Sequence, residues 1–199
     1  MIAIIDYGVG NLRSVQKALE KVGGDVCITQ NKEDILKADK IVFPGVGAIK
    51  PAMDKLEILG LIPVVKEAIA SGKPFLAICV GFQLLFETSE EGSDARGLGL
   101  IKGDVKRFKS LKIPQIGWNA ITKTNDNPLF DGIKDGSHVY FCHSYYVDTP
   151  ETDLITAQTE YGITYTSSIC KDNIYGVQFH PEKSQMVGLK ILNNFVNII

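Results

Sequence analysis

Strand-like and helix-like segments alternate along the first half of the chain, and this alternation constrains the fold more than any other feature. Short apolar runs typical of buried strands occupy residues 2–5, 25–29, 40–43 and 75–79. Apolar residues recur at helical spacing in segments 12–22 and 32–38, in a stretch that ends near Leu59, and in 63–70. Repeated strand–helix–strand units predict a parallel sheet with helices on both faces.

The pattern changes after about Leu98. Short strand-like pieces joined by Gly, Asn and Asp turns follow, at 99–108, 115–124, 137–148, 153–161, 164–172 and 174–180. A last helix is expected over residues 187–198. Because no internal repeat and no linker-like stretch separates the halves, we predict a single domain over residues 1–199. Its fold class is α/β, an open, mostly parallel sheet flanked by helices, with extra antiparallel strands in the second half.

Composition excludes several classes of function. The formal net charge is −2, so nothing in the charge balance favours nucleic acid or an anionic membrane as a partner. No apolar stretch approaches the ~20 residues of a membrane span. The four cysteines are far apart and form no CxxC pair, which argues against a metal site or a disulfide framework. We expect a cytoplasmic protein without a metal or other cofactor.

One cysteine lies where a parallel sheet binds ligands. Cys79 ends the strand 75–79, and ligands of open parallel sheets bind at the carboxyl ends of strands. Small residues two positions before and after it, Ala77 and Gly81, allow the tight turn that lifts a nucleophile out of a strand. The start of the following helix favours the thiolate form of the sulfur. The dipole of one helix is too weak to activate a thiol by itself, so a base is expected nearby.

Of the three histidines, His180 is the best candidate for that base. It ends an apolar strand, and Glu182 follows two residues later. In an extended chain residues i and i+2 face the same side, so the carboxylate can orient the imidazole as the third member of a triad. His138 and His143 lie in an alternating stretch and are expected to be structural or to shape a pocket.

Alternative interpretations remain for these features. A lone cysteine after a strand is more often an inert core thiol. The segment DYGVGN lacks the third glycine of a dinucleotide site, and PGVGAIK lacks the G-K-[ST] of a P-loop. The PGVG segment forms either a tight turn or a loop of backbone amides near Cys79 that holds a developing oxyanion.

Taken together, the motifs resemble a known family. AICVGFQ resembles the G-x-C-x-G-x-Q elbow of class I, triad-type glutamine amidotransferases, and FHPE resembles their second signature. Within that family DYGVGNLRSV, FPGVGA, IGWN, YFCHSYY and VQFHPEKS resemble the glutaminase subunits of imidazole glycerol phosphate synthases. The resemblance runs from Ile4 to the C-terminal helix and implies a flavodoxin-like fold.

The resemblance also implies roles for individual residues. It makes Cys79 the nucleophile on the side-chain amide of glutamine, His180 the general base and acid, and Glu182 the residue that orients His180. The oxyanion is expected at the Val80 amide and at an amide of the loop around Val46 and Gly47. Four further residues match positions that hold the α-amino and α-carboxylate groups of glutamine: Gln83, Glu91, Ser144 and Tyr145.

A partner is implied because the chain has no ATP-binding signature and no room for a synthetase domain. The family's partner is a (β/α)8-barrel cyclase that uses the ammonia to make imidazole glycerol phosphate and an aminoimidazole carboxamide ribotide in histidine biosynthesis. By their places in the matched motifs, the residues expected near this heterodimer interface are Asn11, Trp118, Tyr140 and Lys183.

The sequence departs from the family pattern at two places. Ala77 replaces the first glycine of the elbow, and PQIGWN replaces the Pro-His-Met-Gly-Trp-Asn of many relatives. Alanine is small enough for the turn. The second departure leaves open a cyclase-like partner that makes amidino sugars for surface glycans. A Cys-elbow stress protein without amidotransferase activity is a further alternative, but it leaves Gln83 and His180 with Glu182 without a role.

Overall fold

The computed structural model describes residues 1–92, 95–109 and 111–199. Most strands join one mixed sheet, whose main path runs in the order β2-β1-β3-β4-β13-β12-β10-β6-β5. The strands of the first half pair in parallel as predicted: β1 (Ile2–Ile5), β2 (Val26–Thr29), β3 (Lys40–Gly45) and β4 (Phe75–Cys79). From near the C-terminus, β13 (Ile174–Val177) returns to pair in parallel with β4. Segments about a hundred residues apart therefore end side by side.

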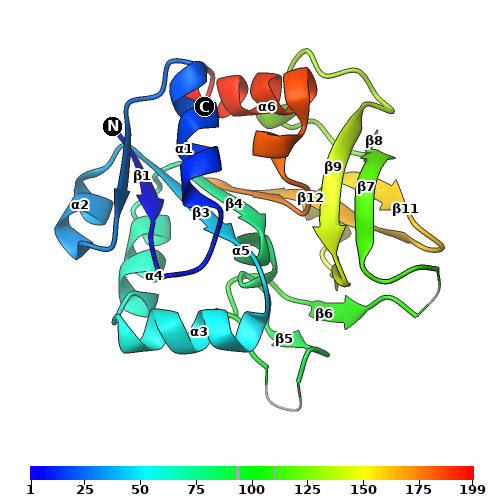
Figure 1. Cartoon of the computed structure of the whole chain (residues 1–199), viewed down its shortest axis with the longest axis horizontal. Coiled ribbons are helices and arrows are strands. Elements are labelled where there is room, and N and C mark those ends of the chain that lie inside the picture. Colours follow the sequence, from blue (N-terminus) through cyan, green and yellow to red (C-terminus); the bar gives the residue numbers. More distant parts are fainter. Residues whose placement is uncertain (93–94, 110) are drawn as a thin grey trace.

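Helices cover both faces of the parallel part (Figure 1). On one face, α1 (Leu12–Lys21) contacts α6 (Gln185–Asn197). The other face carries α2 (Lys32–Lys37), α3 (Ile49–Ile58) and α4 (Ile62–Ala70). The apolar stripes that predicted these helices are the faces they bury, as with Val15 and Leu19 of α1. The predicted fold class is confirmed.

The second half supplies the antiparallel strands. β12 (Thr164–Lys171) pairs antiparallel with β13, and β10 (Tyr145–Asp148) pairs antiparallel with β12 and with β6 (Asp104–Arg107). β11 (Ile155–Glu160) joins β12 and β8 (Thr122–Lys123), while the short β5 (Thr88–Ser89) runs parallel to β6. The extra antiparallel strands were predicted, although β5 was not.

A separate two-stranded ribbon was not predicted. It consists of β7 (Gln115–Ala120) and β9 (His138–His143), which pair antiparallel with Gln115 opposite His143. Side chains alternate across it, because successive residues of a strand point to opposite faces. Gln115 and His143 are buried, whereas Ile116 and Trp118 are exposed. The ribbon therefore has one face toward the core and one toward solvent.

The helix after Cys79 is shorter than the sequence suggested. α5 spans only Val80–Gln83. The carbonyls of Leu84 and Leu85 accept hydrogen bonds from the amides of Leu98 and Leu100, so a neighbouring loop replaces the next helical turn. Three short 3-10 turns were also not predicted: η1 (Pro128–Phe130), η2 (Thr152–Leu154) and η3 (Pro181–Lys183).

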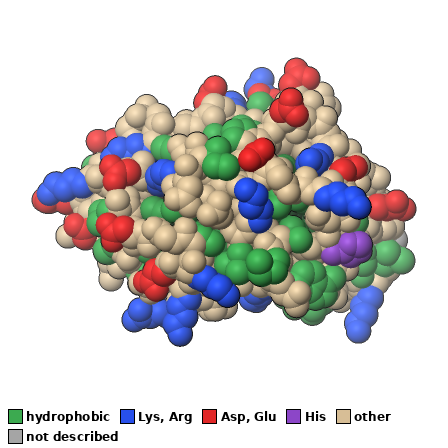
Figure 2. Space-filling view, turned by 90° about the horizontal axis from the view of Figure 1, so that it is seen from above, with side chains coloured by type: hydrophobic (Ala, Val, Ile, Leu, Met, Phe, Trp, Pro, Cys, Tyr) green, Lys and Arg blue, Asp and Glu red, His purple; other side chains and the backbone are tan. Residues whose placement is uncertain are grey.

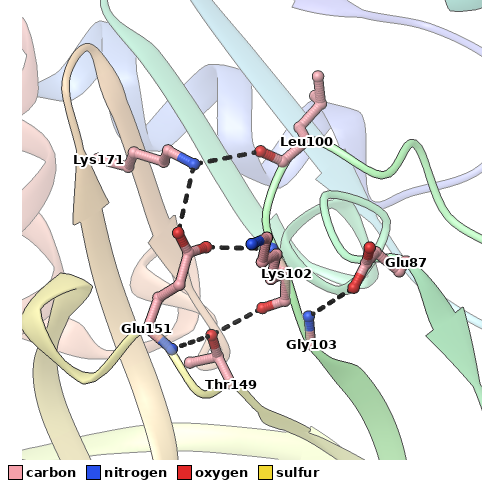
Figure 3. Close-up of polar contacts among 7 residues, drawn as sticks. All are labelled: Glu87, Leu100, Lys102, Gly103, Thr149, Glu151 and Lys171. Atoms are coloured by element: carbon pink, nitrogen blue, oxygen red, sulfur yellow. Dashed lines mark hydrogen bonds and ion pairs between the residues drawn. The ribbon is translucent and has the colours of Figure 1, made fainter.

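A polar network holds the loop of residues 98–103, which follows α5, against the antiparallel half of the sheet (Figure 3). The Glu151 carboxylate accepts a hydrogen bond from the Lys102 amide at 3.1 Å and lies 3.9 Å from the Lys171 ammonium. The Thr149 hydroxyl donates to the Lys102 carbonyl at 2.7 Å. The Glu87 carboxylate accepts a hydrogen bond at 3.1 Å from the amide of Gly103, the residue after Lys102. These contacts fix the segment that leads from α5 to β6.

Two further observations concern the described part of the chain. Its helices are too short or too polar to traverse a bilayer. All four cysteines are free thiols, and Cys79 is the buried one.

Candidate active site

Cys79 occupies a strained turn between β4 and α5. Its backbone has φ 56° and ψ −110°, a region that L residues other than glycine rarely adopt. Gly81 makes the turn possible, because a Cβ there would lie 1.9 Å from the Phe43 carbonyl oxygen of β3. Strained backbone of this kind is typical of functional sites, where surrounding structure enforces it. The turn holds the thiol at the carboxyl edge of the sheet.

His180 reaches the same edge on the neighbouring strand. β13 and β4 are in parallel register, with Val177 opposite Ile78, so both chains leave the sheet at the same end. His180 and Glu182 are joined by a 2.8 Å contact between Nδ1 and Oε1. A carboxylate only accepts hydrogen bonds, so Nδ1 carries the hydrogen. Nε2 is not used by Glu182 and can donate or accept a proton elsewhere. The structure brings the three residues predicted as a triad together.

The imidazole of His180 is set up to carry a positive charge. Burial opposes the charge, but the negative charge of Cys79 and hydrogen bonds to Cys79 and Glu182 outweigh burial and raise the pKa of His180 to about 10. Both side chains of the His180–Glu182 pair are nearly inaccessible, with 4% and 1% of their surfaces exposed. The arrangement favours a positively charged imidazole at His180, beside Cys79.

Ser184 was missed by the sequence analysis. Its buried hydroxyl donates to the His180 carbonyl at 2.7 Å and accepts from the Tyr140 amide at 2.9 Å. The His180 amide in turn donates to the Tyr140 carbonyl at 2.9 Å. The turn η3, which carries Glu182, is thereby tied to β9. The final serine of HPEKS was the available signal, since short hydroxyl side chains often bond nearby backbone groups.

A cavity of about 280 Å³ opens in front of Cys79. Its lining includes all seven residues predicted to bind substrate or to form the oxyanion site: Val46, Gly47, Val80, Gln83, Glu91, Ser144 and Tyr145. His180 and Lys183 also line it. Gly47 has φ 86°, a conformation that glycine adopts without strain, so the loop before α3 can change its peptide orientation at small energetic cost.

Glu91 has a contact that the sequence did not suggest. Its Oε2 accepts a hydrogen bond from the Ile49 amide at 2.5 Å, at the start of α3. Burial raises the pKa of Glu91, and the Ile49 hydrogen bond partly offsets that effect. Glu91 was predicted to hold the substrate, and it is half-buried in the cavity wall; residues 93 and 94 lie outside the described residues.

Gln83 and Gln178 connect the thiol to the opposite cavity wall. The Gln178 amide nitrogen lies 3.8 Å from Cys79 Sγ, and its oxygen accepts from Gln83 Nε2 at 2.9 Å. Gln83 Nε2 also donates to the Tyr145 carbonyl at 3.0 Å. Gln83 was predicted to lie in the site, whereas Gln178 was not. Only the strand register could have pointed to Gln178. Val177 pairs with Ile78, so the residues that follow them, Gln178 and Cys79, lie at the same end of the sheet.

Three of the four predicted interface residues form a row: Trp118 and Tyr140 on the outer face of the ribbon, and Lys183 of η3 beside Tyr140. The rings of Trp118 and Tyr140 meet edge to face with centroids 6.1 Å apart, and the Lys183 ammonium lies 5.7 Å from the Tyr140 centroid. Asn11, the fourth predicted interface residue, is not on the ribbon. It directly precedes α1, and α1 contacts η3, the turn that carries Lys183. Figure 2 shows hydrophobic side chains gathered near a histidine on the side where β7 and β9 lie in Figure 1.

A larger hollow, of about 700 Å³, lies along the open loop of residues 123–132. Its described lining contains no cysteine or histidine and shares no residue with the lining of the cavity at Cys79. Among the described residues, no group of three or more His, Cys, Asp or Glu side chains is arranged to hold a metal ion. The cavity at Cys79 is therefore the candidate active site.

The comparisons with known proteins show the family of the chain. The family model of class-I glutamine amidotransferases matches residues 3–199, and the chain belongs to that family. Within it, the chain is 48% identical over 200 residues to "Imidazole glycerol phosphate synthase subunit HisH" of Bacillus cereus, covering 100% of this chain and 95% of that protein. The HisH subunit of Bacillus cytotoxicus is 46% identical with the same coverage.

Solved structures show the same fold at lower identity. The structure of PurLQS from Thermotoga maritima superposes with a TM-score of 0.77 at 19% identity, covering 99% of this chain and 97% of that one. A glutamine amidotransferase of Thermotoga maritima gives a TM-score of 0.65 at 17% identity, covering 91% and 75%. These matches establish the architecture.

Proposed function

We propose that this chain is the glutaminase subunit of an imidazole glycerol phosphate synthase. It hydrolyses glutamine to glutamate and ammonia and passes the ammonia to a (β/α)8-barrel cyclase. The observation that carries the chemistry is the strained Cys79 turn beside the His180–Glu182 pair, whose Nδ1–Oε1 contact is 2.8 Å. The observation that carries the pathway is 48% identity over the full chain to HisH subunits.

In the proposed reaction the Cys79 thiolate attacks the side-chain amide carbon of glutamine. The negative charge that develops on the amide oxygen is held by the Val80 amide and by an amide of the Val46–Gly47 loop. His180 donates its Nε2 proton to the leaving nitrogen, so that ammonia departs and a γ-glutamyl thioester remains. His180 Nε2 then takes a proton from water, which attacks the thioester and releases glutamate and the thiol. Glu182 keeps the proton on Nδ1 throughout.

The rest of the cavity suits the α-amino and α-carboxylate groups of glutamine. Glu91 supplies a carboxylate for the ammonium group, and Gln83 supports the wall formed by Ser144 and Tyr145. The backbone of Ser144 and Tyr145 is the proposed carboxylate site. All of these residues line the one cavity that contains Cys79, which is the support for assigning them to one substrate.

The partner is proposed to dock on the row of Trp118, Tyr140 and Lys183. Lys183 both lines the cavity and stacks on Tyr140, so this face lies next to the mouth of the site. Ammonia released at Cys79 then leaves toward the partner. An amidino-sugar cyclase is the alternative partner, and the identity to HisH subunits favours the histidine-pathway cyclase.

The test is glutamate production by this chain mixed with the histidine-pathway cyclase, with and without the cyclase's nucleotide ligand. We expect strong stimulation by the liganded cyclase and little activity of the isolated chain, because the Gly47 loop must reorient to complete the oxyanion site. Full activity without the cyclase contradicts this activation step. Glutaminase activity that does not respond to the cyclase overturns the pathway assignment. It does not contradict the proposed triad.

The matched variant is Cys79→Ala. It should abolish glutamine hydrolysis, while synthesis by the complex from added ammonium salts continues, because the cyclase reaction needs ammonia and not the thiol. Loss of both activities would show that the two chemistries are not divided between the subunits as proposed.

A further inference from the structure

His143 has no role in the proposed triad, yet it lies in the wall of the same cavity. It is the last residue of β9 and is 6% exposed. Its ring packs among Phe108, Phe141 and Tyr165, with centroid distances of 5.4, 5.6 and 5.5 Å. This aromatic surrounding excludes water from the ring. Each polar atom of the imidazole therefore depends on a partner within the protein.

Both ring nitrogens of His143 have such a partner. Nδ1 lies 2.6 Å from the Tyr145 carbonyl oxygen, and Nε2 lies 3.3 Å from the Tyr165 hydroxyl. A carbonyl oxygen only accepts, so Nδ1 carries a hydrogen. Burial and the nearby His180 lower the pKa of His143 to about 4, although the Tyr145 hydrogen bond opposes them. The ring is neutral at pH 7, so Nε2 is an acceptor, and the Tyr165 hydroxyl is the donor within its reach.

Gln115 decides whether that hydrogen is available. In the structure the Gln115 side-chain oxygen faces Tyr165 and accepts its hydroxyl hydrogen at 3.0 Å, and Gln115 is 3% exposed. Rotation of the amide exchanges its oxygen and nitrogen. When the nitrogen faces Tyr165, a consistent chain forms: Gln115 donates to Tyr165, Tyr165 donates to His143, and His143 donates to the Tyr145 carbonyl. Gln115 lies opposite His143 in the ribbon, and Gln115 does not line the cavity.

The chain ends at the proposed substrate wall. The Tyr145 carbonyl accepts from His143 Nδ1 and from Gln83 Nε2, the latter at 3.0 Å. Two buried donors therefore fix the peptide group between Tyr145 and Tyr146, which directly follows the segment Ser144–Tyr145. We propose that His143 is a positioning residue for this segment, and that Gln115, through Tyr165, holds His143 in the tautomer that does so. This inference rests on the proposed function, because it assigns the Ser144–Tyr145 backbone to the α-carboxylate of glutamine.

A matched pair of substitutions separates the two ring nitrogens. The amide nitrogen of Asn reaches about the place of Nδ1, and that of Gln reaches about the place of Nε2. His143→Asn keeps the donor to Tyr145 and should leave the KM for glutamine nearly unchanged. His143→Gln loses that donor and should raise KM about tenfold, the effect of one buried hydrogen bond, with a smaller change in kcat. Both are measured on the complex with the liganded cyclase.

A second pair acts from outside the cavity. Gln115→Met has no acceptor, so Tyr165 remains free to donate to His143 and KM should stay at the wild-type value. Gln115→Glu only accepts, so it takes the Tyr165 hydrogen and leaves Nε2 without a donor. KM should then rise by about the same factor as in His143→Gln. A merely structural role for position 115 predicts the opposite order, because Met differs more from Gln in polarity.

The tautomer is read directly by nitrogen NMR of the protein labelled with 15N-histidine. We expect His143 to show a protonated Nδ1 and an unprotonated Nε2 in the wild type and in Gln115→Met. In Gln115→Glu we expect loss of that pattern, by protonation of Nε2 or by exchange between tautomers. A protonated Nε2 with unprotonated Nδ1 in the wild type overturns the inference, as does an unchanged KM in both His143→Gln and Gln115→Glu.

Failure of the inference is distinguishable from failure of the proposed function. If the wild-type complex hydrolyses no glutamine, the proposed function fails, whatever the tautomer. If it hydrolyses glutamine and the variants leave KM unchanged, only the positioning role fails. Ammonia-dependent synthesis by each variant complex serves as the control for folding and docking, and it should match the wild type.

Discussion

At the scale of single residues, the site depends on charges that are held out of water. His180 and Glu182 are almost completely buried and share a 2.8 Å contact. The second carboxylate oxygen of Glu182 is buried without a hydrogen-bond partner among the described residues. A buried carboxylate in this state gains from a positive imidazole beside it. The pair of His180 and Glu182 is therefore already formed in the folded protein, before any substrate binds.

Glu182→Gln should lower the pKa of His180. Removing the carboxylate removes a hydrogen bond and a negative charge, both of which raise that pKa, while the opposing burial remains. The pKa is measured by following the His180 ring signals in an NMR titration, with His138 as the exposed reference. Cys79→Ala should lower it as well. An unchanged pKa of His180 in both variants would contradict the assigned causes.

The same shift has a consequence for stability. Because the pKa of His180 rises from 6.5 to about 10 on folding, its contribution is complete below pH 6.5 and is lost as the pH rises through about 10. The stabilising difference between wild type and Glu182→Gln should shrink over that window in denaturant unfolding. A difference that grows with pH would show that the proton is bound elsewhere.

His143 should make the fold sensitive to acid. Its pKa falls from 6.5 to about 4 on folding, mainly by burial, so the unfolded chain binds a proton in this window and the folded chain does not. Stability attributable to His143 is lost as the pH falls through this window, by about 3 kcal/mol for a shift of this size. His143→Asn, which cannot titrate, should show a shallower loss between pH 6.5 and 4 in urea unfolding. Parallel curves for the two proteins would contradict this.

At the scale of elements, short turns set the position of the catalytic groups, and glycines allow those turns to pack closely. α6 begins directly after η3, and Gly188 of α6 lies against the carbonyl of Pro181. A Cβ at Gly188 would lie 1.9 Å from that oxygen and 2.8 Å from Ser184 Cβ. The helix and the turn that carries Glu182 therefore move together.

Gly188→Ala should displace η3 from its place. We expect a loss of about 1–3 kcal/mol in the free energy of unfolding, typical of forced overpacking, and a fall in glutamine hydrolysis. Ammonia-dependent synthesis should persist. Lys190→Ala on the same helix, a half-buried position, is the control and should change neither. Full glutaminase activity in Gly188→Ala would show that η3 tolerates the shift.

The elements themselves were largely predictable, but their partners were not. Continuous apolar runs revealed the strands of the first half, where β1 and β4 are buried on both faces, and the helical period revealed the helices, each of which buries one face. The separation of β7 and β9 into a ribbon was not predicted, since alternation says that a strand has two faces but not which sheet it joins. The length of α5 was missed because its next carbonyls bond to a distant loop.

At the scale of the whole molecule, the docking face and the cavity are adjacent. The ribbon presents Ile116 and Trp118 to solvent, 62% and 46% exposed, and places Gln115 and His143 on its other side. Exposed aromatic residues beside a lysine are typical of binding surfaces, where tryptophan and tyrosine often dominate the affinity. In the proposed complex, a partner on this face would cover the mouth of the cavity.

Trp118→Ala should weaken binding of the cyclase at least tenfold, as expected for a central aromatic contact. Its exposure means that the free energy of unfolding of the isolated chain should change little. Binding is measured by titration calorimetry. Ile58→Ala, which removes a side chain that is 78% exposed at the end of α3, is the matched control and should leave the affinity unchanged. Equal affinities for wild type and Trp118→Ala would exclude this face as the interface.

The sequence by itself determined the architecture and the candidate triad. Strand and helix periods are local properties of the chain, and motifs such as AICVGFQ and FHPE keep their neighbours at fixed spacing. Cys79, His180 and Glu182 were therefore identifiable without a structure, and so was the family. The strain at Cys79 was implied by the small residues Ala77 and Gly81 around it.

Only the tertiary structure decided which distant groups meet. Parallel pairing of β13 with β4 brings Gln178 to Cys79, and the pairing of β7 with β9 brings Gln115 to His143. Strand pairing across a hundred residues depends on the packing of the whole sheet, which no local pattern encodes. The charge on His180 and the tautomer of His143 follow from that packing, because they depend on what surrounds each ring in three dimensions.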